Sequence, residues 1–83
     1  MGMNELEKQV AVLVADTESV LLSPSAQKLG YLVDAAAEIS DRIRDDFQRA
    51  ADLYNRGDTR DGLSALRVAA ADAENWITRL MNS

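Results

Sequence analysis

The chain has 83 residues, of which 47% are hydrophobic and 28% charged, with nine basic against fourteen acidic side chains. A chain of this length is expected to bury about 60–65% of its unfolded surface, which predicts one domain with a thin core. It contains neither cysteine nor histidine. This excludes disulfides, thiol nucleophiles, the usual general base and the commonest metal ligand.

The net charge of −5 limits the kinds of partner. Nucleic acids and anionic membranes attract basic proteins, so we expect neither as a partner. The longest apolar run, from Val10 to Ala15, is far shorter than the ~20 residues that cross a bilayer. Met1-Gly2 is left out of the predicted fold, because Leu6 stands where a myristoylation signal needs Ser or Thr. We expect a cytoplasmic protein.

The first helix is predicted over about residues 4–22. At about 100° of rotation per residue, one face collects its apolar side chains: Leu6, Val10, Leu13, Val14, Thr17, Val20 and Leu21. Val12 falls on the polar face, and the β-branched residues around it leave a short buried strand as the alternative. We favour the helix because the chain offers no second strand to pair with.

The second helix is predicted over about residues 25–55 and has the strongest periodic signal. Its core face comprises Leu29, Leu32, Val33, Ala36, Ile39, Ile43, Phe47, Ala50, Ala51 and Tyr54. Ser23 is expected to cap this helix, with Pro24 in the first helical position, where its missing amide hydrogen is not needed. Glu38 to Arg42 and Asp45 to Arg49 place acid before base at the spacing that supports an exposed helix.

The third helix is predicted over about residues 59–81. Gly57 is expected to end the second helix in the left-handed conformation, and Asp58 or Thr59 to cap the third. Apolar residues then recur at spacings of three and four: Leu63, Leu66, Ala70, Ala73, Ile77 and Leu80. This seam is typical of a close-packed antiparallel helix pair.

The turn between the second and third helices resembles that of one tetratricopeptide repeat. The resemblance covers about twenty residues, with Leu53 to Asp58 followed by Leu63, Leu66 and Ala69. Gly62 stands where the family has a small alanine, Thr59 replaces its aromatic residue, and its closing proline is absent. The resemblance implies a helical hairpin and transfers no binding residues.

Together these elements predict an all-α fold, a three-helix up-down-up bundle built on a long antiparallel helical hairpin. The hairpin of residues 25–81 is expected to be the structural core, with the first helix contributing less. The predicted single domain spans residues 1–83.

Acidic side chains at Glu38, Asp41, Asp45 and Asp46 are spaced to share one helical face, a pattern that a hard cation can use. Arg42, Arg44 and Arg49 lie among them, which favours a solvated, charge-compensated surface instead. We therefore predict no metal, no cofactor, no small-molecule substrate and no enzymatic activity.

Trp76 lies beside the seam, on a second stripe of the third helix. Most of its neighbours on this stripe are small: Ala65, Ala69 and, at the margin, Ala73 and Leu80. A similar side stripe on the second helix comprises Tyr31, Ala35 and Leu53. Small residues beside one large aromatic residue allow another helix to approach closely. Either the first helix covers Trp76, or these residues form a protein interface.

Two functions follow as hypotheses. The first is a small acidic helical protein–protein interaction module, an adaptor, small chaperone or assembly factor that forms a homodimer or binds another protein. In shape alone, this resembles small secretion or flagellar export chaperones. The alternative is an acidic regulatory inhibitor, of the antitoxin or immunity type, that docks on a basic partner.

Overall fold

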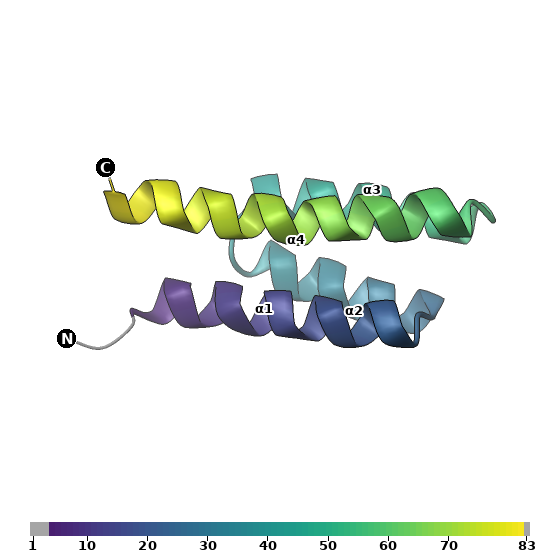
Figure 1. The fold of residues 1–83 in the computed structure, drawn as a ribbon, viewed down its shortest axis with the longest axis horizontal. Helices are drawn as coiled ribbons and strands as arrows, with labels where there is room; N and C mark the ends of the chain where they lie inside the picture. Colours follow the sequence, from purple (N-terminus) through teal and green to yellow (C-terminus); the bar gives the residue numbers. More distant parts are fainter. Residues whose placement is uncertain (1–3, 83) are drawn as a thin grey trace.

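The computed structural model describes residues 4–82, which form four α-helices joined by short turns (Figure 1). The helices are α1 (Glu5–Leu22), α2 (Ala26–Ala37), α3 (Asp41–Asn55) and α4 (Thr59–Asn82). None of the described residues belongs to a strand. The predicted all-α bundle is therefore confirmed, whereas the three-helix count and the up-down-up topology are wrong. Met1-Gly2 lies outside the described residues.

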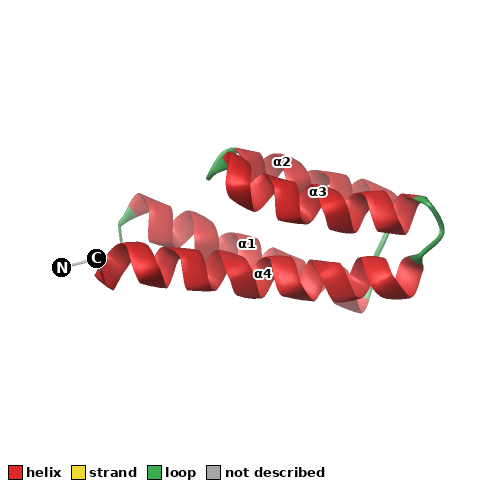
Figure 2. Cartoon of the chain, turned by 90° about the horizontal axis from the view of Figure 1, so that it is seen from above, coloured by secondary structure: helices red, strands yellow, loops and turns green. Residues whose placement is uncertain are grey.

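The helices alternate in direction, up-down-up-down, in two layers (Figure 2). One layer holds α1 and α4 and the other holds α2 and α3, so that α1 packs on α2 and α4, and α3 packs on the same two helices. α4 has 24 residues and α3 has 15. α1 and α4 therefore extend past the α2–α3 layer at the end that carries both termini (Figure 1). Within residues 4–82, no helix has the length and apolarity that crossing a membrane requires.

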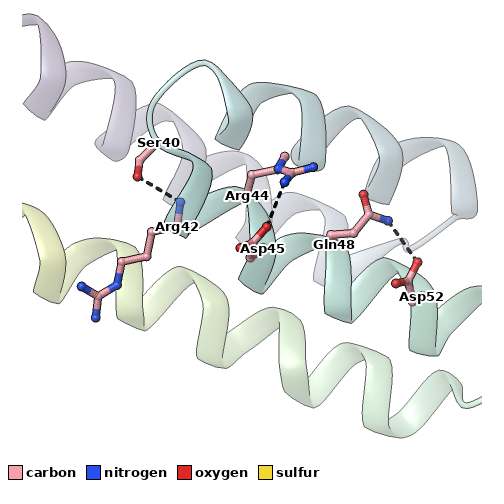
Figure 3. Close-up of polar contacts among 6 residues, drawn as sticks. All are labelled: Ser40, Arg42, Arg44, Asp45, Gln48 and Asp52. Atoms are coloured by element: carbon pink, nitrogen blue, oxygen red, sulfur yellow. Dashed lines mark hydrogen bonds and ion pairs between the residues drawn. The ribbon is translucent and has the colours of Figure 1, made fainter.

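The predicted helix over residues 25–55 is wrong because the chain reverses between α2 and α3. At this turn the amides of Ile39 and Ser40 both donate to the Ala36 carbonyl, each at 3.0 Å. The Ser40 hydroxyl then accepts from the Arg42 amide at 3.2 Å, and this bond starts α3 (Figure 3). A serine cap suffices to begin a helix without any glycine or proline at the turn.

The other helix ends follow the sequence more closely. Asn4 and Glu7 form a reciprocal capping box at the start of α1, with bonds of 2.8 and 3.0 Å. Ser25, not Ser23, caps α2 by accepting from the amide of Lys28, so Pro24 precedes the cap. Gly57 has the predicted left-handed conformation, with φ of 95°.

The core draws on all four helices. Its buried apolar side chains are Val10, Leu13, Val20, Leu29, Leu32, Val33, Ala36, Ile43, Phe47, Ala50, Ala51, Leu66, Ala69 and Ala73. Thr17 is also fully buried, and its hydroxyl donates to the Leu13 carbonyl at 2.7 Å. α1 thus contributes Val10, Leu13 and Val20 to the core, and Val12 is exposed, as its place on the polar face predicts.

The start of α4 lies against the end of α3 at Gly62. A Cβ atom on Gly62 would lie 2.9 Å from the Tyr54 backbone nitrogen and 3.1 Å from its Cα. Backbone atoms cannot yield at such distances, so this closest approach of the two helices requires glycine. The small residue that the sequence places here therefore has a packing role.

Candidate protein-interaction site

A groove of 430 Å³ runs along the outer face of α3 and α4. Its lining comprises Asp46, Arg49 and Leu53 of α3 with Asp61, Ala65, Val68, Ala69 and Asp72 of α4. On each helix these residues recur at spacings of three and four, which places them on one face. The apolar members of the lining are Leu53, Ala65, Val68 and Ala69, and Val68 is 58% exposed despite its size.

The sides of this groove are acidic. Asp46, Asp61 and Asp72 line it together with one cation, Arg49. The pKa of Asp46 is raised above its ordinary value of 3.8, first because the carboxylate is partly buried and then because Asp72 faces it from α4. Asp45 adds to the rise, while Arg42 and Arg49 oppose it.

Trp76 lies beside this groove, in a small cavity of 110 Å³. Arg42, Ile43 and Asp46 of α3 line the cavity together with Asp72, Trp76 and Arg79 of α4. Asp46 and Asp72 line both spaces, so the groove continues past these two carboxylates to the indole. Trp76 is half-buried and packs against the core. Residues at the beginning of α3, and none from α1, line this cavity together with α4.

A second groove, of 450 Å³, lies between α1 and α2. Its apolar residues include Val12 and Tyr31, each 58% exposed, together with Ala35 and Ile39. The Tyr31 hydroxyl donates to Asp16 Oδ2 at 3.4 Å, a long hydrogen bond across the groove. The charged lining is mixed and comprises Glu5, Lys8, Asp16 and Glu38.

The predicted interface residues fall into three places. Leu53, Ala65 and Ala69 line the α3–α4 groove, and Trp76 lies at its extension. Tyr31 lies in the α1–α2 groove, since the turn at residues 38–40 separates it from Leu53.

The remaining two predicted residues belong to neither groove. Ala73 is fully buried in the core, while Leu80 is 47% exposed near the end of α4. Sequence reasoning missed Val68, although it follows Ala65 by three residues, and it missed the facing pair Asp46 and Asp72, which only the packing of α3 on α4 brings together.

Two acidic residues of α3, Asp45 and Asp52, have ordinary surface partners (Figure 3). Arg44 Nη2 lies 3.0 Å from Asp45 Oδ1, and the Gln48 side-chain amide donates to Asp52 Oδ1 at 3.0 Å. The predicted pairs Glu38 with Arg42 and Asp45 with Arg49 do not form ion pairs in the described part of the chain. Nowhere in residues 4–82 do three or more acidic side chains form a group that could hold a metal ion.

Another hollow of the surface, of 590 Å³, has different chemistry. It lies along α3 and is lined only by polar side chains: Asp45, Gln48, Arg49, Asp52, Asn55 and Arg56. The α3–α4 groove, whose lining combines apolar with charged side chains, is the stronger candidate.

Comparison with known proteins adds no relative. No protein-family model matches the chain, and neither a curated protein nor a solved structure shows significant similarity to it.

Proposed function

We propose that this chain is a non-enzymatic protein-interaction module, of the adaptor, small-chaperone or assembly-factor type, whose α3–α4 groove receives a helix of another protein. One observation supports this proposal: the apolar side chains of Leu53, Ala65 and Val68 line a groove between two helices. Small side chains in this lining allow the axis of a third helix to come close to α3 and α4. Covering Val68 removes apolar surface from water and stabilises the complex.

The alternative function, an acidic inhibitor that docks on a basic partner, is supported by the charge of the same groove. Asp46, Asp61 and Asp72 outnumber Arg49 along its sides. The two functions share a binding surface and differ in what binding does to the partner. A complex that weakens steeply with added salt favours the inhibitor, and a salt-tolerant complex favours the adaptor.

Self-association is a separate part of the proposal, and we assign it to the α1–α2 groove. A two-fold dimer brings the same patch of both copies together. At the α1–α2 groove Lys8 can face Glu5, Asp16 or Glu38 of a second copy, while Val12 and Tyr31 supply apolar area.

Photo-crosslinking from two matched positions tests both parts. Val12 and Val68 are the same residue type, equally exposed on helices, and line different grooves. A photoreactive side chain at position 68, in the cells that make the protein, is expected to capture a different protein through a helical segment. The same side chain at position 12 is expected to capture a second copy of the chain.

The glutamate variants Val68→Glu and Val12→Glu provide the control. Glutamate favours helix more than valine, so an exposed substitution preserves the fold. With the photoreactive side chain moved to position 65 of the same groove, Val68→Glu is expected to abolish capture of the other protein, and Val12→Glu to leave it intact. Capture from position 68 that yields only copies of this chain contradicts the proposed heterologous function.

A further inference from the structure

We infer that the turn between α2 and α3 is a hinge that straightens, so that two copies of this chain exchange their helical halves. In the exchanged dimer, α2 and α3 form one continuous helix over residues 26–55. The α1–α2 half of each copy then packs on the α3–α4 half of the other copy. Each of the two grooves lies within one half, so the exchange keeps both of them.

The backbone at this turn departs little from a helix. The amides of Glu38 and Ser40 donate to carbonyls four residues earlier, at 3.3 and 3.0 Å, as in an α-helix. The Arg44 amide donates in the same way to the Ser40 carbonyl at 2.9 Å. Glu38 has helical backbone angles, whereas Ser40 is extended, with φ of −167° and ψ of 139°. A straight helix therefore needs a change of backbone angles mainly at Ser40.

The other two turns are less able to become helical. Pro24 lies between α1 and α2, and a proline inside a helix clashes with the carbonyl four residues earlier. Gly57 lies between α3 and α4 and has φ of 95°, the left-handed conformation that ends a helix. The turn at residues 38–40 contains neither glycine nor proline. It is therefore the turn that straightens at the lowest cost in free energy.

The sequence across this turn suits a straight helix. Apolar residues continue one face through it at spacings of three and four: Ala36, Ile39, Ile43 and Phe47. Glu38 precedes Arg42 by four residues, the order and spacing that stabilise a helix. In the described part of the chain these two side chains form no ion pair. A straight helix brings them one turn apart on the same face.

The contacts between the two halves determine that the partner is a second copy. α1 packs on α4, and α2 packs on α3, across the division between the halves. After exchange the same side chains meet between copies, so the dimer keeps the core of the monomer. It loses the Ser40 cap and gains helical partners for the first three amides of α3. Only a chain with the same side chains reproduces these contacts.

Three variants of the full chain change the balance between turn and helix. Ser40→Ala removes the hydroxyl that caps α3 through a hydrogen bond of 3.2 Å. Ser25→Ala is the matched control, because its hydroxyl caps α2 at the same distance and Pro24 keeps that turn bent. Asp41→Pro places a proline in the first position of α3, where it fits the turn and blocks a straight helix.

Light scattering at increasing concentration measures the association of each variant. All of them carry Val12→Glu, so that the proposed contact at the α1–α2 groove does not contribute. Ser40→Ala is expected to dimerise about thirtyfold more tightly than its parent, because a lost cap changes the equilibrium about fivefold and each dimer straightens two turns. Ser25→Ala lacks its cap in monomer and dimer alike, so its association should equal that of the parent. Asp41→Pro should stay monomeric, and circular dichroism checks its helicity.

Spin labels show whether the dimers are exchanged. Gln27 and Asn55 are exposed and line one hollow between α2 and α3, so labels on cysteines at these positions lie close together in the monomer. On a straight helix the two positions are about 42 Å apart. The labelled chain is refolded with excess unlabelled chain, so that pulsed electron paramagnetic resonance measures the distance within one chain. The long distance is expected in the dimers of Ser40→Ala.

A short distance in every dimer overturns the inference. So does an Ser40→Ala variant that associates no more tightly than Ser25→Ala, since a general loss of stability affects both alike. A long distance in Asp41→Pro also contradicts the hinge. None of these results bears on the proposed function, which crosslinking from position 68 decides, because the α3–α4 groove is the same before and after exchange.

Discussion

The α3–α4 and α1–α2 helix pairs pack together with side chains of different size. Where α3 meets α4, Gly62 lies against the backbone of Tyr54, and alanines continue the contact along α4. Between α1 and α2, by contrast, Tyr31 and Val12 remain more than half exposed in an open groove. Small residues allow α3 and α4 to pack closely and leave a shallow outer groove. The larger residues between α1 and α2 leave much of their side chains exposed.

The two grooves have the same balance of charged residues. Three acidic residues and one cation line each of them, with Arg49 in the α3–α4 groove and Lys8 in the α1–α2 groove. They differ instead in how much apolar side chain they expose, because Val12 and Tyr31 are both more than half exposed in the α1–α2 groove, whereas Val68 alone is so exposed in the α3–α4 groove. This difference is the basis on which we propose separate partners, another protein for one groove and a second copy for the other.

The largest expected difference between the regions concerns their aromatic residues. Trp76→Ala is expected to lower the free energy of unfolding by about 3 kcal/mol, at the lower end of the range for buried aromatic residues, because Trp76 is half-buried against the core. Tyr31→Ala is expected to cost less than ~1 kcal/mol, since most of Tyr31 is exposed. Urea denaturation measures both, and equal losses would contradict the assignment of Trp76 to the packed region.

The close approach at Gly62 gives the next largest effect. Gly62→Ala is expected to destabilise the fold by about 2 kcal/mol, because the new methyl group meets the Tyr54 backbone. Gly30→Ala in α2 is the matched control: its Cβ enters open space, so helix propensity is expected to stabilise the fold by about 0.5–1 kcal/mol. Thermal melts of the two variants should move in opposite directions. Stabilisation by both would mean that α3 and α4 are not in close contact here.

Hydrogen exchange compares the two pairs without any substitution. Amides of α1 are expected to open at a free energy at least ~1 kcal/mol below those of α3 and α4, because α1 lines an open groove on its α2 side and contains several β-branched residues. This prediction retains the lesser role that the sequence assigns to the first helix. Equal protection of α1 and α4 would show that the four helices open as one unit.

The smallest effect concerns pH. Because the pKa of Asp46 is raised in the folded chain, folding favours its protonated form, and the charged form reduces stability at neutral pH. Asp46→Asn is therefore expected to raise the melting temperature slightly at pH 7. The gain should shrink as the pH falls through the raised pKa and vanish below 3.8, where Asp46 is protonated in both the folded and the unfolded state.

Melts of Asp46→Asn and the chain itself at several pH values, with Asp34→Asn as the control, measure this effect. Between pH 6 and 8 we expect little change, since the chain has no histidine or cysteine to titrate there. An Asp46→Asn variant less stable than the chain at pH 7 would contradict the raised pKa of Asp46.

Much of the core could be predicted from the sequence, because buried side chains follow helical periodicity. The turn at residues 38–40 could not, since Ala36, Ile39, Ile43 and Phe47 keep their spacing of three and four straight through it. Ser40 caps the start of α3 there, and no glycine or proline marks the turn. Periodicity reports which residues face the core, and it does not report where the chain reverses.

The candidate site was predictable only one helix at a time. Ala65 and Ala69 share a face of α4, which the spacing of the sequence shows. Asp46 faces Asp72 because of the register in which α3 packs on α4. The spacing of residues within one helix does not determine that register. The separation of Tyr31 from Leu53 has the same origin, since it depends on the reversal between α2 and α3.

Amide chemical-shift mapping tests most directly whether the two grooves serve different partners. The protein captured by crosslinking from position 68 is added to the ¹⁵N-labelled chain, and shifts are compared between the grooves. We predict that the largest changes fall on α3 and α4 around Leu53, Val68 and Trp76, while the amides of Val12 and Tyr31 keep their chemical shifts. Changes centred on Val12 and Tyr31 would place this partner in the α1–α2 groove and contradict the account.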